Sequence, residues 1–205
     1  EDSHIFLPQI AHTREFFLFL ELIPFTYAIN ADVGAVMVAH IWFSAIDTEE
    51  LPATLSYNVV TGLLRQELGY DGIIMTDAMD MDAITNRYTS EEAAIRAVLA
   101  GVDLVVYGVG FSEARQQAAM QAVYDAVLDG RIDESRIDES VYRILSAKMR
   151  YGLTEWQPLD PVTAPQRIAD AQTNSLLPEV FDAGVTVAYD NNDKVPVDAQ
   201  TTVAI

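Results

Sequence analysis

Residues 72–84, with the sequence GIIMTDAMDMDAI, decide the fold because a short apolar run passes directly into three aspartates. The apolar residues before Thr76 are typical of a strand that is buried on both faces of a sheet. Asp77 ends this strand, and Asp80 and Asp82 follow in the next loop or first helical turn. The stretch therefore predicts a buried strand with a carboxylate at its carboxyl end.

Two runs of similar composition flank this strand, AVMVAHI at residues 35–41 and DLVVYG at residues 103–108. Both are rich in apolar and β-branched residues, and we predict that both are strands. Amphipathic helical segments separate the three runs. Because strands that alternate with helices form parallel sheets, the sequence predicts an α/β fold.

The predicted helices carry clear end signals. A serine that can cap a helix precedes each of three segments, and a glycine suited to a left-handed stop follows each one. The pairs are Ser56 with Gly69, Ser90 with Gly101, and Ser112 with Gly130.

A perfect five-residue duplication, RIDESRIDES, occupies residues 131–140. We interpret it as a polar approach to the next helix, with Asp138 or Ser140 as the expected cap. That helix ends at Gly152 and carries several apolar residues on one face. These residues are Val141, Ile144, Leu145 and Met149.

Composition changes near the carboxyl end. We predict residues 1–155 as one domain and the Pro-rich, irregular residues 156–170 as a linker. The run VTVAYD at residues 185–190 is typical of the opening strand of another α/β unit. Residues 171–205 are therefore expected to begin a second α/β domain.

Charge and composition exclude several classes of protein. Twelve basic residues are scattered among thirty-one acids, giving a formal charge of −19. This balance argues against a nucleic-acid partner, whose phosphates require clustered Lys and Arg. The longest apolar stretches contain Glu21 and Pro24, so no membrane span is predicted. The absence of cysteine excludes disulfides and thiolate metal sites.

Position alone makes Asp77 the first candidate for chemistry. In folds of repeated βα units, catalytic groups project from the carboxyl ends of strands. An ordinary acid at the end of a strand remains the alternative for Asp77. Asp80 and Asp82 are better explained as acids near a helix start, where free N–H groups and the dipole favour them.

A longer pattern resembles a known family. VMVAHI, LPATLS and TGLLRQELGYDGIIMTDAMDMDAI, in this order, are similar to the core of family 3 glycoside hydrolases, in particular the β-N-acetylglucosaminidase branch. The resemblance continues through AGVDLVVYG and RIDESVYRILSAKMRYGL and covers residues 2–153. It implies about three βα units, the C-terminal part of a TIM-type (β/α)8 barrel. The start of a second α/β domain would follow.

The resemblance also implies a chemistry. A retaining hydrolase needs a nucleophilic carboxylate and a second group that protonates the leaving oxygen. The family pattern assigns the nucleophile to Asp77. In the branch concerned, a histidine held by an aspartate two residues earlier is the acid/base, and these residues are His4 and Asp2. The implied partner is a carbohydrate with terminal β-N-acetylglucosamine, and no metal or organic cofactor is needed.

Three more residues are candidate substrate contacts. His40 ends the strand AVMVAH and could face the pocket, or it could have a hydrogen-bonded structural role. Trp42 could stack on a sugar face or serve packing alone. Met79 lies in the turn that follows Asp77.

The resemblance has gaps that leave alternatives open. Asp32 stands where the family usually has Gly, and Ser44 where it often has Pro. A Lys-His pair and a glycine-rich loop that bind the sugar in the family have no counterpart in this sequence. We expect an excerpt of a longer enzyme, completed by a missing segment or another chain. The alternative is a short gene product with a structural or binding role on a decayed hydrolase scaffold.

Two other functions fit the same residues. A β-N-acetylglucosamine phosphorylase is conceivable because a histidine acid/base does not repel phosphate as a carboxylate would. A non-catalytic subunit or assembly module on a truncated hydrolase scaffold is the alternative from a different class. The family resemblance favours an exported protein or one of the cell envelope.

Overall fold

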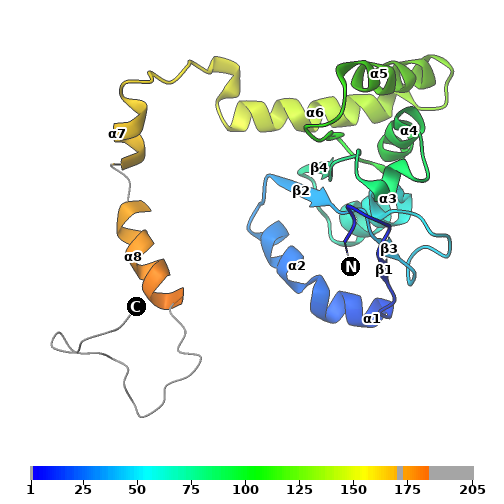
Figure 1. Cartoon of the computed structure of the whole chain (residues 1–205), viewed down its shortest axis with the longest axis horizontal. Helices are drawn as coiled ribbons and strands as arrows, with labels where there is room; N and C mark the ends of the chain where they lie inside the picture. Colours follow the sequence, from blue (N-terminus) through cyan, green and yellow to red (C-terminus); the bar gives the residue numbers. More distant parts are fainter. Residues whose placement is uncertain (1, 170–172, 185–205) are drawn as a thin grey trace, which may run out of the picture. The chain divides into compact units, whose positions relative to one another are not determined.

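The structure is a computed structural model that describes residues 2–169 and 173–184. The chain divides into two units, residues 1–155 and residues 156–205 (Figure 1). All the strands named below belong to the first unit. The strand predicted at residues 185–190 lies outside the described residues.

Two pairs of parallel strands organise the first unit. Strands β2 (Ala35–Val38) and β4 (Ile73–Thr76) pair in parallel, with Val36 opposite Ile74. The two strands predicted from the apolar runs are thereby confirmed. Strands β1 (Gln9–Ile10) and β3 (Trp42–Phe43) form a second parallel pair that the sequence did not predict.

The third predicted strand, at residues 103–108, is wrong as a continuous strand. Only Leu104 forms a parallel bridge, to Met75. Two residues further on, the backbone amide of Val106 bonds to the hydroxyl oxygen of Thr76 at 2.8 Å instead of to a strand carbonyl. Because a side chain replaces the ladder bond, the segment follows β4 in parallel without regular strand geometry.

Helices cover and connect these strands (Figure 1). In chain order they are α1 (Arg14–Phe16), η1 (Phe17–Glu21), α2 (Ile23–Asn30), η2 (Ala53–Leu55), η3 (Asn58–Glu67), α3 (Asp82–Thr85), α4 (Ser90–Ala100), α5 (Glu113–Leu128), α6 (Glu134–Arg150) and η4 (Leu153–Glu155). The turns η2 and η4 are of the 3₁₀ type, and η1 and η3 are wound as π-helices.

Most predicted helix ends are confirmed. The Ser56 hydroxyl accepts the Val59 amide at 3.0 Å at the start of η3, and Gly69 after that helix has a φ of 68°. Ser112 caps α5 by accepting the Arg115 amide. Gly130, with a φ of 74°, follows α5 as predicted.

The cap of α4 is shifted by one residue from the prediction. Thr89, and not Ser90, is the cap, because the Thr89 hydroxyl accepts the Glu92 amide at 3.2 Å. Ser90 is the first helical residue. Gly101 ends the helix as predicted, with a φ of 113°.

The predicted start of α6 is wrong, because the helix begins five to seven residues earlier than expected. The helix begins at Glu134, and its cap is Asp133, whose carboxylate accepts the Ser135 amide at 3.0 Å. Asp138 and Ser140, the predicted caps, lie inside the helix. Because Asp133 of the first copy caps the helix, the second copy, residues 136–140, lies within it.

The main core lies between the β2–β4 pair and the helices η3 and α4. Its buried members include Val38, Leu55, Val60, Leu64, Ile74, Met79, Ile84, Ala93, Ala97 and Val102. Ala93, Ala97 and Ala100 are spaced by three or four residues along α4, so the helix presents a narrow face of small residues to the main core.

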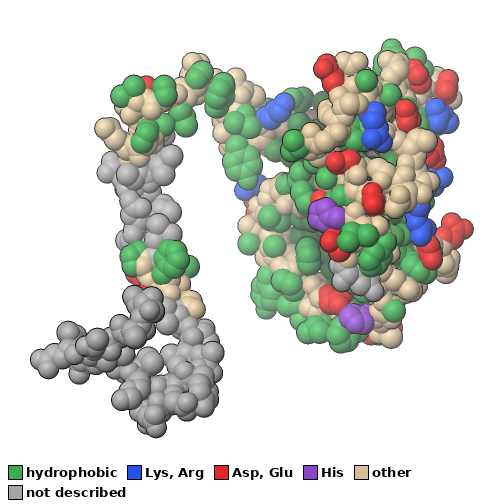
Figure 2. Space-filling view, viewed as in Figure 1, with side chains coloured by type: hydrophobic (Ala, Val, Ile, Leu, Met, Phe, Trp, Pro, Cys, Tyr) green, Lys and Arg blue, Asp and Glu red, His purple; other side chains and the backbone are tan. Residues whose placement is uncertain are grey.

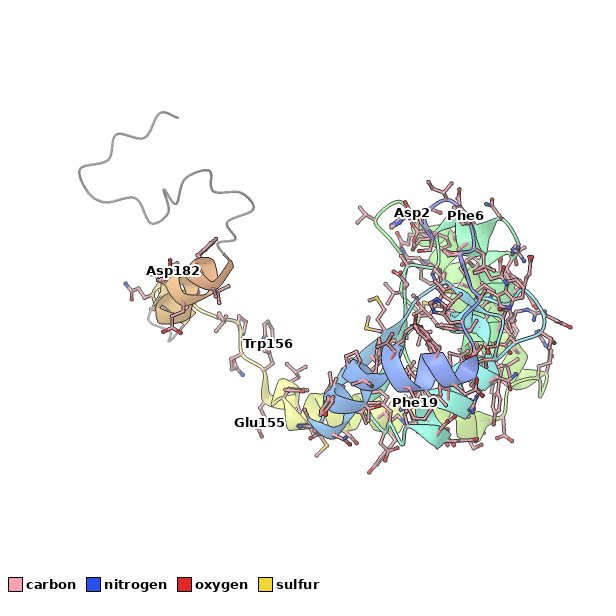
Figure 3. The ribbon with its side chains drawn as sticks, turned by 90° about the horizontal axis from the view of Figure 1, so that it is seen from below. Asp2, Phe6, Phe19, Glu155, Trp156 and Asp182 are labelled. Atoms are coloured by element: carbon pink, nitrogen blue, oxygen red, sulfur yellow. The ribbon has the colours of Figure 1, made fainter. Side chains whose placement is uncertain are left out.

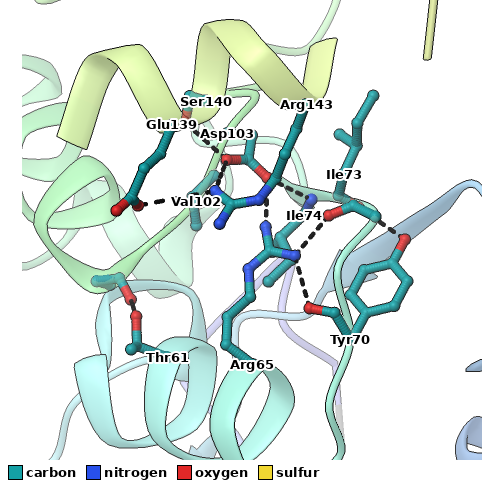
Figure 4. Close-up of polar contacts among 12 residues, drawn as sticks. Thr61, Arg65, Tyr70, Ile73, Ile74, Val102, Asp103, Glu139, Ser140 and Arg143 are labelled. Carbon is teal, nitrogen blue, oxygen red and sulfur yellow. Dashed lines mark hydrogen bonds and ion pairs between the residues drawn. The ribbon is translucent and has the colours of Figure 1, made fainter. Parts of the chain in front are cut away.

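A buried carboxylate joins the amino end of residues 103–108 to two helices (Figure 4). The Asp103 side chain has no exposed surface and forms ion pairs with Arg65 of η3 at 2.5 Å and Arg143 of α6 at 3.2 Å. Arg136 lies 3.6 Å away, and the Ser140 hydroxyl donates to Asp103 at 2.6 Å. We call these residues the Asp103 cluster.

Large apolar side chains remain exposed over the helical segment from α1 to α2 (Figure 2). Phe19, which Figure 3 marks on this segment, is 77% exposed, and Met37 of β2 is 52% exposed. On α6, the predicted apolar face is also largely exposed at Val141, Leu145 and Met149. Among the described residues, no helix is both long enough and apolar enough to cross a membrane.

The second unit contains two described helices, α7 (Ala164–Ala169) and α8 (Thr173–Gly184). Helix α7 falls inside the segment predicted as an irregular linker. Pro165 is the second residue of this helix, where its fixed φ and missing N–H are tolerated.

Candidate active site

Asp77 stands where β4 ends. Its backbone amide donates to the Val38 carbonyl of the neighbouring strand at 3.0 Å, and its carboxylate accepts the amide of Ala78 at 2.7 Å. The residue is half-buried. The β2–β4 pair thus fixes the backbone of Asp77 and leaves its side chain in the turn that follows.

His40 lies beside this turn but is fully buried. One ring nitrogen, Nε2, is 3.0 Å from the Ala78 carbonyl, and the other, Nδ1, is 2.7 Å from the Thr54 hydroxyl. A carbonyl oxygen only accepts, so Nε2 must carry the proton that it donates to Ala78. Both ring nitrogens are therefore engaged by protein groups, and as a sugar contact His40 stays a prediction.

Burial lowers the pKa of His40 from its ordinary value. The hydrogen bond to Ala78 and the charges of Asp77 and Asp80 oppose this effect without reversing it. Above this lowered pKa the ring is neutral with its proton on Nε2, and Nδ1 is then the nitrogen that can accept from the Thr54 hydroxyl. His40 connects the end of β2 to the residue after Asp77.

The Asp2 and His4 side chains form a pair at the amino end of the described chain. His4 donates its Nδ1–H to the Asp2 carboxylate at 2.8 Å and its backbone amide to the same oxygen at 2.9 Å. These bonds, the backbone one foremost, lower the pKa of the Asp2 carboxyl. Both side chains are exposed, at 57% and 75%.

This terminal turn lies against the helix that follows Asp77. The Ser3 carbonyl accepts the amide of Ala83, the second residue of α3, at 3.4 Å. The turn that carries Asp2 (marked in Figure 3) therefore reaches the same loop region as Asp77. Of the predicted site residues, Asp2, His4, His40 and Asp77 are gathered around the segment from the end of β4 to α3.

The other two predicted residues have different surroundings. The Met79 side chain is 2% exposed and belongs to the main core. Trp42 is half-buried, and its indole N–H donates to the Asp47 carbonyl at 2.9 Å. As sugar contacts, both residues stay predictions.

Asp80 makes a contact that the sequence did not predict, since the sequence explained it only as an acid near a helix start. Its carboxylate accepts the amide of Gly108 at 2.6 Å, across 28 residues of sequence. The signal that could have found this contact is the glycine that closes the run DLVVYG. A glycine directly after a strand-like run can mark a close approach to another group.

The arrangement provides a carboxylate at a strand end and an imidazole that a second carboxylate orients. These groups can perform nucleophilic attack and proton transfer. Among the described residues, no three His, Asp or Glu side chains are arranged to hold a metal ion.

Parallel strands connected through helices, with an acid at the carboxyl end of a strand, are typical of βα-repeat proteins, in which functional sites lie at the carboxyl ends of the strands. Residues 1–147 match the glycosyl hydrolase family 3 N terminal domain. The chain therefore belongs to this family, whose N-terminal domain has a TIM-barrel-type fold. The family predicted from the sequence is confirmed.

Relatives of known name agree with this assignment. The chain is 32% identical over 164 residues to the β-hexosaminidase A of Pseudoalteromonas piscicida, covering 73% of this chain and 27% of that protein. It is 28% identical over 179 residues to a β-N-acetylglucosaminidase/β-glucosidase of Cellulomonas fimi, covering 83% and 31%.

Solved structures give the same result. The family 3 β-N-acetylglucosaminidase of Paenibacillus sp. str. FPU-7 has 48% sequence identity and a TM-score of 0.74, over 78% of this chain and 30% of that one. The chain thus spans less than a third of the length of each of these relatives.

Proposed function

We propose that this chain carries the catalytic carboxylate and the acid/base dyad of a retaining glycoside hydrolase that removes terminal β-N-acetylglucosamine. Asp77 is the nucleophile, His4 the general acid/base, and Asp2 the residue that orients His4. The observation that carries the proposal is the approach of the Asp2–His4 turn to α3, through the bond between Ser3 and Ala83, six residues after Asp77. The names of the relatives support the substrate class.

Each group has one role in the first chemical step. An Asp77 oxygen attacks the anomeric carbon, and the bond from that carbon to the leaving oxygen breaks. His4 gives its Nε2 proton to the leaving oxygen. Its Nδ1–H stays bonded to Asp2, whose negative charge stabilises the protonated ring before transfer.

The second step reverses these roles. Water attacks the anomeric carbon, the bond between that carbon and Asp77 breaks, and His4 takes the water proton at Nε2. The product keeps the β configuration, because two displacements on the same carbon restore it. Asp77 and His4 are then ready for another cycle.

We also propose that residues 1–155 are the C-terminal part of the barrel, about three βα units, and that residues 156–170 link it to a second α/β domain that begins at residues 171–205. The parallel β2–β4 pair and the parallel bridge at Leu104 support the first part. The exposed apolar side chains of Phe19 on η1 and Met37 on β2 support further polypeptide that completes the barrel. An experimental structure of the complete protein with an antiparallel neighbour for β2 would contradict this arrangement.

Hydrolysis of 4-nitrophenyl β-N-acetylglucosaminide by the protein that carries the full chain tests the nucleophile. We expect Asp77→Asn to lower kcat by about 10³-fold or more, because the amide cannot form the glycosyl ester. Asp82→Asn is the matched control, since Asp82 is an exposed acid five residues further on. Activity retained in Asp77→Asn, or lost equally in Asp82→Asn, would remove Asp77 from the proposed role.

A further inference from the structure

We propose that Asp80 is a positioning residue, whose hydrogen bond to the Gly108 amide holds in place the turn that carries Asp77. This inference rests on the proposed function and deepens it. It assigns a role to an acid that the sequence alone explains as an ordinary helix-start residue.

The turn after β4 is held on both of its sides. On the β2 side, the Asp77 amide donates to the Val38 carbonyl at 3.0 Å, and His40 donates to the Ala78 carbonyl at 3.0 Å. On the other side, the Met79 amide donates to the Val106 carbonyl at 2.9 Å. Asp80, which follows Met79, contributes through its side chain. Its carboxylate accepts a hydrogen bond from the Gly108 amide on the same side as Val106.

The contact between Asp80 and Gly108 is unusually close. The Gly108 amide lies 2.6 Å from one carboxylate oxygen. A Cβ atom added at Gly108 would lie 2.6 Å from both oxygens of that carboxylate. The glycines with positive φ are Gly69, Gly101, Gly130 and Gly152 within the described residues. A larger residue at position 108 would therefore have to displace the Asp80 carboxylate from its bond to the backbone amide.

A short stretch of backbone connects this contact to Asp77. Only two residues separate Asp77 from Asp80, and Met79 between them is anchored in the core. A charge-assisted bond from a backbone amide to a carboxylate is short and directional, so it limits where the turn can lie. Because a misplacement of about 1 Å can lower a catalysed rate by about 10²-fold, loss of this bond should reduce turnover.

The first experiment compares kcat and KM for hydrolysis of 4-nitrophenyl β-N-acetylglucosaminide. Asp80→Ala should lower kcat by roughly 10- to 100-fold while KM changes by less than about 3-fold. Asp80→Asn should recover most of the activity, because its amide oxygen still accepts the Gly108 N–H. Asp82→Ala, which changes an exposed acid two residues away, is the control and should match the wild type. Equal losses in Asp80→Asn and Asp80→Ala would overturn the proposed role.

A double-mutant cycle tests the pair directly. Gly108→Ala should lower kcat when Asp80 is present, because its methyl group would displace the carboxylate. In the Asp80→Ala background, the same change should cost much less, since the space is then empty. Losses that multiply independently would contradict the inference.

Amide hydrogen exchange separates this inference from the proposed function. In Asp80→Ala, the Gly108 and Ala78 amides should exchange faster, whereas amides of α5 should not change. A wild-type protein that does not cleave the glycoside overturns the proposed function alone. Unchanged exchange at Gly108 and Ala78 in Asp80→Ala overturns the positioning role, whatever the activity.

Discussion

At the scale of single residues, His40 is a buried neutral imidazole whose hydrogen bonds depend on its protonation state. Its pKa is lowered by burial, so the unfolded chain binds a proton more readily than the folded one does. The stability that the neutral ring contributes is present above the unfolded pKa of about 6.5 and is lost as the pH falls towards the lowered folded value.

We therefore expect unfolding in urea to occur more easily at pH 5.5 than at pH 7.5, in part because of His40. His40→Gln can still donate to the Ala78 carbonyl but does not titrate, so its free energy of unfolding should depend less on pH. The difference should not exceed about 1.4 kcal/mol, the limit one pH unit below the unfolded pKa. An identical pH dependence in both proteins would contradict the neutral, buried ring.

Some residues of the candidate site could be predicted from the neighbouring sequence, and others could not. Asp77 could be predicted because a carboxylate at the end of an apolar run is visible in the sequence. The pairing of Asp80 with Gly108 could not, because it joins residues that are 28 positions apart. The burial of His40 was open for a similar reason, since it depends on Thr54 and Ala78 from two later segments.

At the scale of elements, the end of α4 combines a left-handed glycine with a tight contact. Gly101 has a φ of 113°, and a Cβ atom there would lie 2.3 Å from the Thr61 hydroxyl oxygen. That hydroxyl donates to the Ala100 carbonyl at 2.7 Å and so joins η3 to α4.

Gly101→Ala should lower the free energy of unfolding by about 2 to 3 kcal/mol, from backbone strain and the displaced Thr61. Gly130→Ala is the matched control, because it has a similar left-handed φ of 74° but open space at the Cβ position. Urea unfolding of both variants measures the difference. Equal losses would show that strain alone acts and that the contact with Thr61 contributes nothing.

The fold could be predicted where the residues of an element, or those at its ends, determine its structure locally. The strands β2 and β4 and the ends of η3 and α5 follow from apolar runs, serines and glycines. The predictions were wrong where a side chain outside the predicted element determines whether a strand continues or where a helix begins. Thr76 replaces a ladder bond and interrupts the third strand, and an earlier cap at Asp133 lengthens α6.

At the scale of the whole first unit, the Asp103 cluster holds segments that are far apart in the sequence. One buried carboxylate faces Arg65, Arg136 and Arg143, which come from η3 and α6. Arg65 also donates to the Tyr70 and Gly72 carbonyls just before β4. Sequence patterns do not pair charges at such separations, so the cluster could not be predicted.

Asp103→Asn should be strongly destabilising, by about 3 kcal/mol or more, because it leaves three guanidinium groups around a site without a charge. Asp32→Asn is the control, since the Asp32 pair with Arg150 is exposed and should contribute little. Thermal and urea unfolding compare the two variants. A loss in Asp103→Asn no larger than that in Asp32→Asn would mean that the cluster does not stabilise the unit.

The duplication RIDESRIDES has a consequence for anyone who aligns relatives of this chain. Its two copies are identical, so a gap of five residues can be placed over either copy without changing an alignment score. The copies are nevertheless not equivalent in space, because Arg131 is 52% exposed whereas Arg136 is 16% exposed and contacts Asp103. Homologous positions here can be assigned only by superposition, with the arginine beside Asp103 as the fixed point.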